Sequence, residues 1–166
     1  MKKILFLVLL MVSGSTAWAK QVVIQTKNTT MVLDVETGRQ PQYVYYGAKL
    51  TDYDLQHLQG VRGGRMDAYP AYGMNCPAEA AVAMTHADGN LSTELYATDV
   101  TTQGQLTQIT LSDPKYPVSV VLCYKACFDE DMIETWTEIK SGEAKPVTLT
   151  QFSSISLPIL RGNVWL

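Results

Sequence analysis

Three carboxylates stand in a row in this sequence, and such a run could bind calcium or supply a general acid with a raised pKa. Asp129, Glu130 and Asp131 lie between two runs of alternating apolar residues. Consecutive strand residues point to opposite faces, so these side chains do not converge on one ion, and their spacing is not that of an EF-hand loop. The pattern therefore favours a solvated hairpin turn over either chemical role.

Other chemistry-bearing residues lack the spacing of known catalytic or metal-binding motifs. The two histidines, His57 and His86, belong to no HExxH pattern, and the chain has no CxxC or GxSxG motif. A glycine-rich basic segment at residues 60–65 lacks the Lys-Ser/Thr pair of a phosphate-binding loop. We therefore expect structural histidines, a mobile loop at 60–65, no metal and no cofactor, and we assign no catalytic residue.

The three cysteines are predicted to be free thiols. Cys123 and Cys127 are four residues apart on one predicted strand, which separates their Cα atoms by about 13 Å, whereas a disulfide needs less than about 7 Å. Cys76 could pair with either of them. Because cysteine is often buried without a partner, free thiols are the favoured interpretation.

Tyrosines cluster in two places, where their rings could stack on sugar rings or pack in a core. Tyr43, Tyr45 and Tyr46 belong to one predicted strand, and Tyr69 and Tyr72 flank a proline in a separate segment. Core packing is the commoner role for buried aromatic residues. Tyr69 and Tyr72 are the candidates for substrate binding.

The elements that must position these residues are short β-strands. The clearest run is 118–128, where alternate residues are apolar, as in a half-buried antiparallel strand. Further strands are predicted at 22–26, 30–35, 42–46, 106–111, 133–139 and 147–155, the last continuing the meander. The dipeptide Asp88-Gly89, between runs 81–86 and 92–101, predicts a hairpin with a type I′ turn.

About nine strands with regular turn signals predict a single all-β domain, an antiparallel β-sandwich. A short helix is predicted within residues 50–58, where three leucines could share one side. The chain has 166 residues, 46% of them apolar, and a formal net charge of −3. It is too short for a (β/α)₈ barrel of roughly 250 residues, and it lacks the basic surface charge of a nucleic-acid-binding protein.

The first residues have the order of a secretory signal. Lys2 and Lys3 precede an apolar run at 4–12, and an A-x-A pattern ends at Ala19. The run of about nine residues is much shorter than the roughly 20 residues that span a bilayer. We expect residues 1–19 to be a signal peptide and residues 20–166 to be an exported, soluble domain in the periplasm or medium, without membrane or nucleic-acid partners.

The last residues have the pattern of a strand, a turn at Gly162 and the start of another strand. Natural domains usually end in polar, frayed residues, so this pattern predicts the front portion of a longer protein. Apolar groups at Leu157, Ile159, Val164 and Trp165 would then be left exposed and promote self-association.

Five stretches resemble, in the same order, the front of the family 36 glycoside hydrolases, the α-galactosidases. They are residues 43–47, 69–73, 85–95, 131–137 and 149–154, and the resemblance covers residues 21–166. It implies a β-supersandwich that precedes a catalytic (β/α)₈ barrel, where two aspartates act as nucleophile and general acid/base in a retaining mechanism. That barrel would lie beyond Leu166, so no residue here receives a catalytic role.

The resemblance implies that the sandwich packs on the barrel, supports assembly, which includes a homo-oligomer, and approaches the α-galactoside pocket with its loops. This sequence departs from the family pattern at residues 74–78, where many members have an acidic residue, an arginine and Pro-Ala. Two alternatives stay open. One is a free-standing carbohydrate-binding β-sandwich module, and the other is a structural domain that acts only through its packing.

Overall fold

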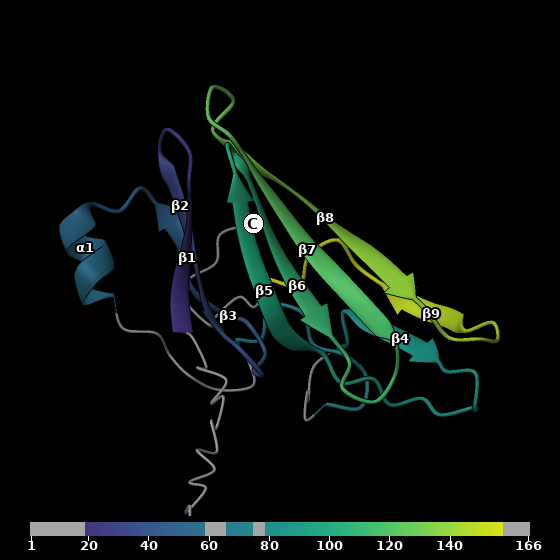
Figure 1. The fold of residues 1–166 in the computed structure, drawn as a ribbon. Coiled ribbons are helices and arrows are strands. Elements are labelled where there is room, and N and C mark those ends of the chain that lie inside the picture. The colour runs from purple at the N-terminus through teal and green to yellow at the C-terminus, as the bar shows by residue number, and fades with distance from the viewer. Residues whose placement is uncertain (1–18, 59–65, 75–78, 158–166) are drawn as a thin grey trace, which may run out of the picture.

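The computed structural model describes residues 19–58, 66–74 and 79–157, and within these ranges the chain is almost entirely β-structure. Nine strands form three antiparallel sheets (Figure 1). The elements are β1 (Ala19–Gln25), β2 (Thr29–Glu36), β3 (Gln42–Ala48), α1 (Asp52–His57), β4 (Val82–Thr85), β5 (Tyr96–Gln103), β6 (Leu106–Ser112), β7 (Val118–Cys127), β8 (Met132–Ser141) and β9 (Thr148–Phe152). The predicted all-β, antiparallel fold class is therefore confirmed. Among the described residues, no helix has the length and hydropathy needed to cross a bilayer.

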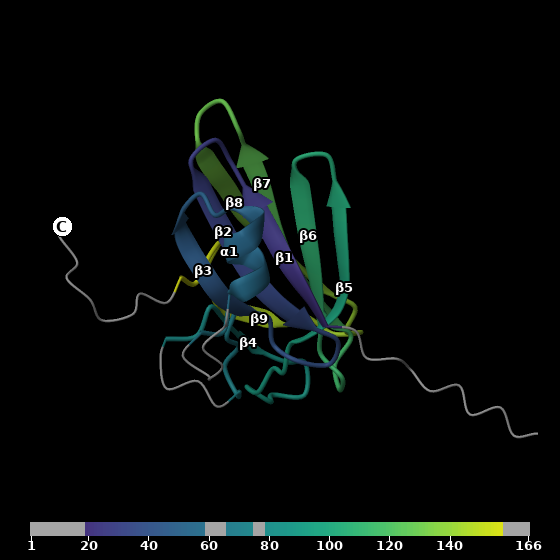
Figure 2. The same ribbon diagram turned by 90° about the vertical axis from the view of Figure 1, so that its left-hand side faces the viewer.

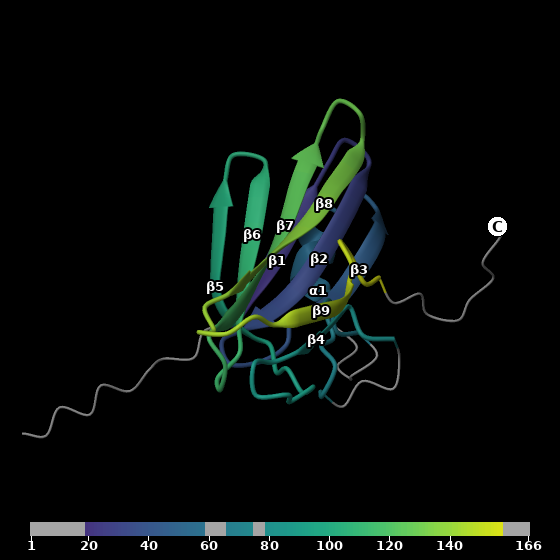
Figure 3. The ribbon, with the colours of Figure 1, turned by 90° about the vertical axis from the view of Figure 1, so that its right-hand side faces the viewer.

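Two of the sheets pack face to face and enclose the core. The sheet β1-β2-β3 lies against the sheet β5-β6-β7-β8, as Figures 2 and 3 show from opposite sides. Alternate residues of each strand point inward, because successive strand side chains face opposite ways. On β7 these are Val118, Val120 and Leu122, and on the neighbouring β6 they are Ile109 and Leu111, all of them buried. The alternation predicted for both strands is thus confirmed.

The outer face of the β1-β2-β3 sheet is covered by the segment that contains α1 (Figure 2). The Leu50 N–H donates to the Thr30 hydroxyl (3.0 Å), and the Gln25 amide donates to the Leu50 carbonyl (3.1 Å). Val32, which lies between the core residues Met31 and Leu33 on β2, is fully buried. A capping box between Thr51 and Asp54 begins the helix, which falls inside the predicted range of 50–58 but is shorter.

The turn between β7 and β8 is anchored to the turn between β1 and β2. The Asp131 carboxylate accepts hydrogen bonds from the Thr26 hydroxyl (2.5 Å), the Asn28 N–H (2.8 Å) and the Asn28 amide (3.0 Å). These donors lower the pKa of Asp131 to about 2. The predicted hairpin turn is confirmed, and its last carboxylate has a lowered pKa, the opposite of a raised-pKa acid.

The turn predicted at Asp88-Gly89 is present but is not of type I′. The Gly89 N–H donates to the His86 carbonyl (2.9 Å), and the His86 N–H donates to the Asn90 carbonyl (2.8 Å). Gly89 has a φ of 87°, whereas Asp131 is the only described non-glycine residue with a positive φ. A type I′ turn needs positive φ at both central residues, so that assignment is wrong.

The hairpin pairing predicted around this turn is also wrong, because β4 pairs with β9 and β5 pairs with β6. The backbone N–H groups after the turn form hydrogen bonds with other segments instead of with β4. The Thr93 N–H donates to the Tyr72 carbonyl (2.8 Å), and the Glu94 N–H donates to the Asp113 carboxylate (2.7 Å). These bonds direct the chain away from β4 before β5 begins.

The last described strand does not continue the meander beside β8, contrary to the prediction for residues 147–155. Instead β9 pairs antiparallel with β4, and this two-stranded sheet lies at one end of the sandwich (Figures 1 and 3). The connection after β8 is held at Glu143, whose carboxylate binds His86 and the backbone of Ala87. This contact holds the connection close to the end of β4, where Thr85 pairs with Thr148 of β9.

Candidate functional site

The two tyrosines predicted to bind substrate have different surroundings. Tyr69 is 2% exposed, belongs to the core and donates its hydroxyl to the Ser153 carbonyl (3.0 Å). Its ring has no free face for a sugar, so the structure gives it a packing role. Tyr72 is 54% exposed and is the accessible one of the two candidates.

The backbone around Tyr72 is fixed on two sides. The Tyr72 N–H donates to the Val82 carbonyl (2.9 Å), and the Tyr72 carbonyl accepts from the Thr93 N–H (2.8 Å). Gly73 has a φ of 109°, and a Cβ there would lie 2.7 Å from the Ser92 Cα. Only glycine therefore allows the two segments to approach this closely.

We call this pair of segments, residues 71–74 and 91–93, the Tyr72 rim. Leu91 on the second segment is 50% exposed, so an aromatic ring and an aliphatic side chain stand on adjacent segments. Such surfaces can contact the apolar face of a sugar or another protein. Of this surface, the sequence predicts Tyr72 alone as a substrate-binding residue.

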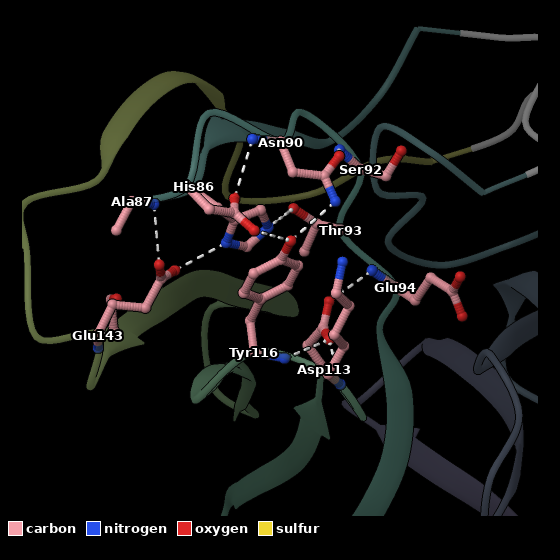
Figure 4. A network of polar contacts seen from close by, with 12 residues as sticks. His86, Ala87, Asn90, Ser92, Thr93, Glu94, Asp113, Tyr116 and Glu143 are labelled. Atoms are coloured by element: carbon pink, nitrogen blue, oxygen red, sulfur yellow. Dashed lines mark hydrogen bonds and ion pairs between the residues drawn. The ribbon is translucent and has the colours of Figure 1, made fainter.

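Behind the rim lies a buried polar network around His86 (Figure 4). The His86 Nδ1 lies 2.7 Å from the Glu143 Oε1, and the His86 Nε2 lies 3.0 Å from the Thr93 hydroxyl. The second Glu143 oxygen accepts from the Ala87 N–H (2.9 Å). The hydrogen bonds from His86 and Ala87 lower the pKa of Glu143.

Tyr116 covers one face of the His86 imidazole. The two rings are stacked, with centroids 3.6 Å apart and planes 10° apart. The Tyr116 hydroxyl donates to the Asp88 carboxylate (2.9 Å) and accepts from the Asn90 amide (2.8 Å). The network thus joins the 86–93 loop to the connection between β6 and β7, where the Asp113 carboxylate accepts from the Tyr116 N–H (2.9 Å).

The order of groups in Thr93, His86 and Glu143 is that of a nucleophilic triad: hydroxyl, imidazole and carboxylate. Thr93 and the His86 side chain are both fully buried. A nucleophile must reach its substrate, so this triad-like arrangement does not act as one. The prediction that His86 is structural is confirmed. Sequence spacing missed its partners because Glu143 is 57 residues away and belongs to no local motif.

The remaining predicted sites do not assemble into a second centre. His57 is exposed on α1, where its ring stacks on Tyr53. Cys123 and Cys127 are free thiols, the first buried and the second partly exposed, as predicted for the pair. Cys76 and the segment 60–65 lie outside the described residues. Within the described ranges, no group of three or more His, Cys, Asp or Glu side chains is placed to hold a metal ion.

Of the three tyrosines in the first cluster, Tyr43 alone belongs to the core. Tyr43 is buried, and its hydroxyl lies 3.4 Å from that of Tyr124 on the facing sheet. Burial raises the pKa of Tyr43 to about 12, and it raises the pKa of Tyr124 as well. The Tyr45 hydroxyl donates to the Ala48 carbonyl (2.9 Å), whereas Tyr46 is 53% exposed.

Comparison with solved structures finds the same fold at the front of several α-galactosidases. The enzyme from Lactobacillus brevis superposes with a TM-score of 0.68 and is 15% identical, covering 82% of this chain and 23% of its own. The enzyme AgaB from Geobacillus stearothermophilus gives a TM-score of 0.71 at 16% identity, covering 83% of this chain and 24% of its own. A variant of AgaA from the same organism, solved with raffinose, gives a TM-score of 0.69 at 16% identity and the same coverage. The chain thus spans about a quarter of the length of these proteins.

Curated protein sequences give no significant match. The family model of the glycosyl hydrolase family 36 N-terminal domain matches residues 39–166, which is most of the chain. The expected resemblance is confirmed, and the chain belongs to the family of glycosyl hydrolase family 36 N-terminal domains.

Proposed function

We propose that this chain is the N-terminal β-sandwich of an exported α-galactosidase-like enzyme that hydrolyses terminal α-galactosides with retention of configuration. The match to the family 36 N-terminal domain carries this proposal, and the likeness of fold to α-galactosidases supports it. The two catalytic aspartates would belong to a (β/α)₈ barrel outside these 166 residues. The role of the present domain is then to support that barrel and to shape its sugar pocket.

An exposed apolar surface on β9 supports the packing role. Phe152 is 68% exposed and Leu149 is 39% exposed, and both lie on the last described strand. Among the residues that the structure describes, this strand pairs with β4 alone. Exposed aromatic and aliphatic side chains on an edge strand favour contact with a further protein surface. A catalytic domain, or a second copy in a homo-oligomer, would cover them.

The Tyr72 rim supports the second part of the role. Tyr72 presents an exposed ring with a polar tip, which suits stacking on a sugar. Its fixed backbone allows it to hold a constant position at the wall of a pocket. We expect the rim to contribute to an α-galactoside site that the barrel completes.

Residues 20–166 alone test the proposal that the barrel carries catalysis and that this domain only supports it. We expect no hydrolysis of an aryl α-galactoside, because a retaining glycosidase needs two carboxylates about 5 Å apart across the substrate. We also expect no saturable binding of raffinose in an NMR titration, because the sugar site is complete only with the barrel. Turnover by a homogeneous sample that is lost on changing one carboxylate would contradict the proposal.

Saturable raffinose binding by the isolated domain would favour the second candidate, a free-standing carbohydrate-binding module. The exposed ring of Tyr72 is the observation in favour of that candidate. The change Tyr72→Ala should then abolish binding, while Tyr46→Ala, at a similarly exposed tyrosine on β3, should leave it intact.

Export is part of the proposal, and the signal-like order of the first residues supports it. Residues 1–18 lie outside the described residues. Cleavage after Ala19 would remove one residue from β1 and leave Lys20 paired with Val35. N-terminal sequencing of the protein from cells should begin at Lys20, and a mature protein that begins at Met1 would contradict export.

A further inference from the structure

We propose that His86 is a positioning residue for the Tyr72 rim, acting through Thr93 and held in place by Glu143. The inference rests on the proposed function, in which Tyr72 lies at the wall of a carbohydrate pocket. It adds that the placement of Tyr72 depends on a buried imidazole that never touches the sugar.

An unbroken series of hydrogen bonds links these groups, and Figure 4 shows its part from Glu143 through His86 to Thr93. Glu143 Oε1 lies 2.7 Å from His86 Nδ1, and His86 Nε2 lies 3.0 Å from the Thr93 hydroxyl. The Thr93 N–H then donates to the Tyr72 carbonyl at 2.8 Å. Thr93 is therefore held by its side chain on one side, and it holds Tyr72 with its backbone on the other.

The packing around the series leaves little freedom for any member. Thr93 and the His86 side chain are fully buried, and the Glu143 side chain is 7% exposed. Gly73 packs directly against Ser92, so a shift of the 91–93 segment must displace the backbone next to Tyr72. A rotation of the imidazole would be transmitted to the rim in the same way.

The protonation state of Glu143 controls this series. With His86 in the tautomer that protonates Nδ1, both carboxylate oxygens accept an N–H, from His86 and from Ala87, and protonation turns one of these acceptors into an O–H donor, which weakens the bond there. The other ionisable groups near the imidazole are Tyr116, which stacks on it, and Asp88, which binds the Tyr116 hydroxyl.

Two further ionisable groups reach His86 only through Tyr116. The Lys115 ammonium lies 4.7 Å from the centroid of the Tyr116 ring, and Asp113 binds the Tyr116 backbone. Neither contacts the imidazole, which leaves Glu143 as its direct ionic partner. Acid that protonates Glu143 should therefore loosen the rim before it unfolds the sheets.

Amide hydrogen exchange by NMR on residues 20–166 tests the proposal without any carbohydrate. The variant Thr93→Val keeps the shape of the side chain and removes its hydroxyl, which leaves a buried imidazole nitrogen without a partner. A buried group left in this way shifts local opening by about tenfold or more. We expect the Tyr72 and Thr93 amides to exchange at least that much faster, while amides of β6 and β7 keep their rates.

Two variants sharpen the result. Thr107→Val is the matched control, because Thr107 is also buried and its hydroxyl lies 3.3 Å from that of Thr102, away from the rim. It should leave the exchange of Tyr72 unchanged, whereas Thr93→Ser, which restores the hydroxyl, should return the rim to the rate of the original protein. Glu143→Gln should loosen the rim at neutral pH and remove its sensitivity to acid.

Unchanged exchange at Tyr72 and Thr93 in Thr93→Val would overturn the proposal. A uniform increase across all strands would also overturn it, because that result describes a residue that only stabilises the fold. Failure of the proposed function has a different signature, since a domain whose parent protein does not act on α-galactosides would still show the rim effect.

Discussion

The imidazole Nδ1 of His86 lies 2.7 Å from the carboxylate of Glu143, although 57 residues separate them in the chain. His86 directly follows Thr85, which pairs with Thr148 at the point where β4 ends and β9 begins. The connection after β8 is therefore tied to the turn after β4 at the point where the two strands meet. A buried ionic hydrogen bond and a strand pairing stabilise the same long-range approach.

The buried tyrosine pair should make the fold sensitive to alkali. The pKa of Tyr43 is raised to about 12, so its neutral form contributes stability that is complete below pH 10 and is lost as pH rises from 10 to 12. At about 1.4 kcal/mol per pKa unit, the loss from Tyr43 approaches about 3 kcal/mol. Urea unfolding between pH 8 and 12 measures it, and Tyr43→Phe should flatten the decline. An equal decline in both proteins would contradict this assignment.

The anchored turn at Asp131 should make the fold sensitive to acid. The pKa of this carboxyl is lowered to about 2, so its stabilising effect is present above pH 4 and disappears as pH falls towards 2. Asp131→Asn should lower the free energy of unfolding at neutral pH and reduce its dependence on pH below 4. Asp129→Asn in the same turn is the control, and a similar effect of the two changes would refute the special role of Asp131.

Alanine substitutions at two glycines with positive φ distinguish the cost of backbone strain from the cost of a steric clash. Gly73→Ala places a Cβ 2.7 Å from Ser92 and should destabilise the domain by about 2 kcal/mol or more. Gly104 lies in the β5-β6 turn with a φ of 60°, and a Cβ there would meet nothing within 4 Å, so Gly104→Ala should cost about 1 kcal/mol. Denaturant unfolding of the two variants gives the comparison, and equal losses would show that the contact with Ser92 is unimportant.

Leu157, one of the apolar residues expected to be exposed, packs partly buried against the core, and Ile159, Val164 and Trp165 lie outside the described residues. The exposed surface on β9 should itself cause self-association of residues 20–166. Sedimentation velocity over a concentration series should show a mass that rises with concentration, and Phe152→Ser should reduce this rise because it removes the most exposed apolar ring of β9. Met132→Ser is the control, since Met132 is 55% exposed and lies at the β7-β8 turn, away from β9 (Figure 1). A concentration-independent monomer would favour a self-contained module.

Local patterns in the sequence predict the strands well because alternation is a property of neighbouring residues. The alternate apolar residues of β6 and β7 indicate both the strands and their inward faces. Strand pairing depends on contacts between distant segments, which is why the pattern does not identify the partner of β9. The turn at Gly89 is a similar case. The Asp-Gly dipeptide predicts a turn, but it does not predict which distant groups accept the hydrogen bonds of the Thr93 and Glu94 N–H groups after it.

The candidate site is predictable only in part, for a related reason. The exposed ring of Tyr72 and the buried ring of Tyr69 stand in one short motif, and their different burial depends on how that motif meets β4 and residue 153. The partners of His86 come from three separate connections of the chain. No local spacing in the sequence encodes such a convergence.

The most direct test of the proposed function is the α-galactosidase activity of the protein made from the whole reading frame that contains these 166 codons, beside that of residues 20–166. We expect the whole product to hydrolyse an aryl α-galactoside and the isolated domain to be inactive. A reading frame that stops directly after codon 166, or a longer product that leaves α-galactosides intact, would contradict the account.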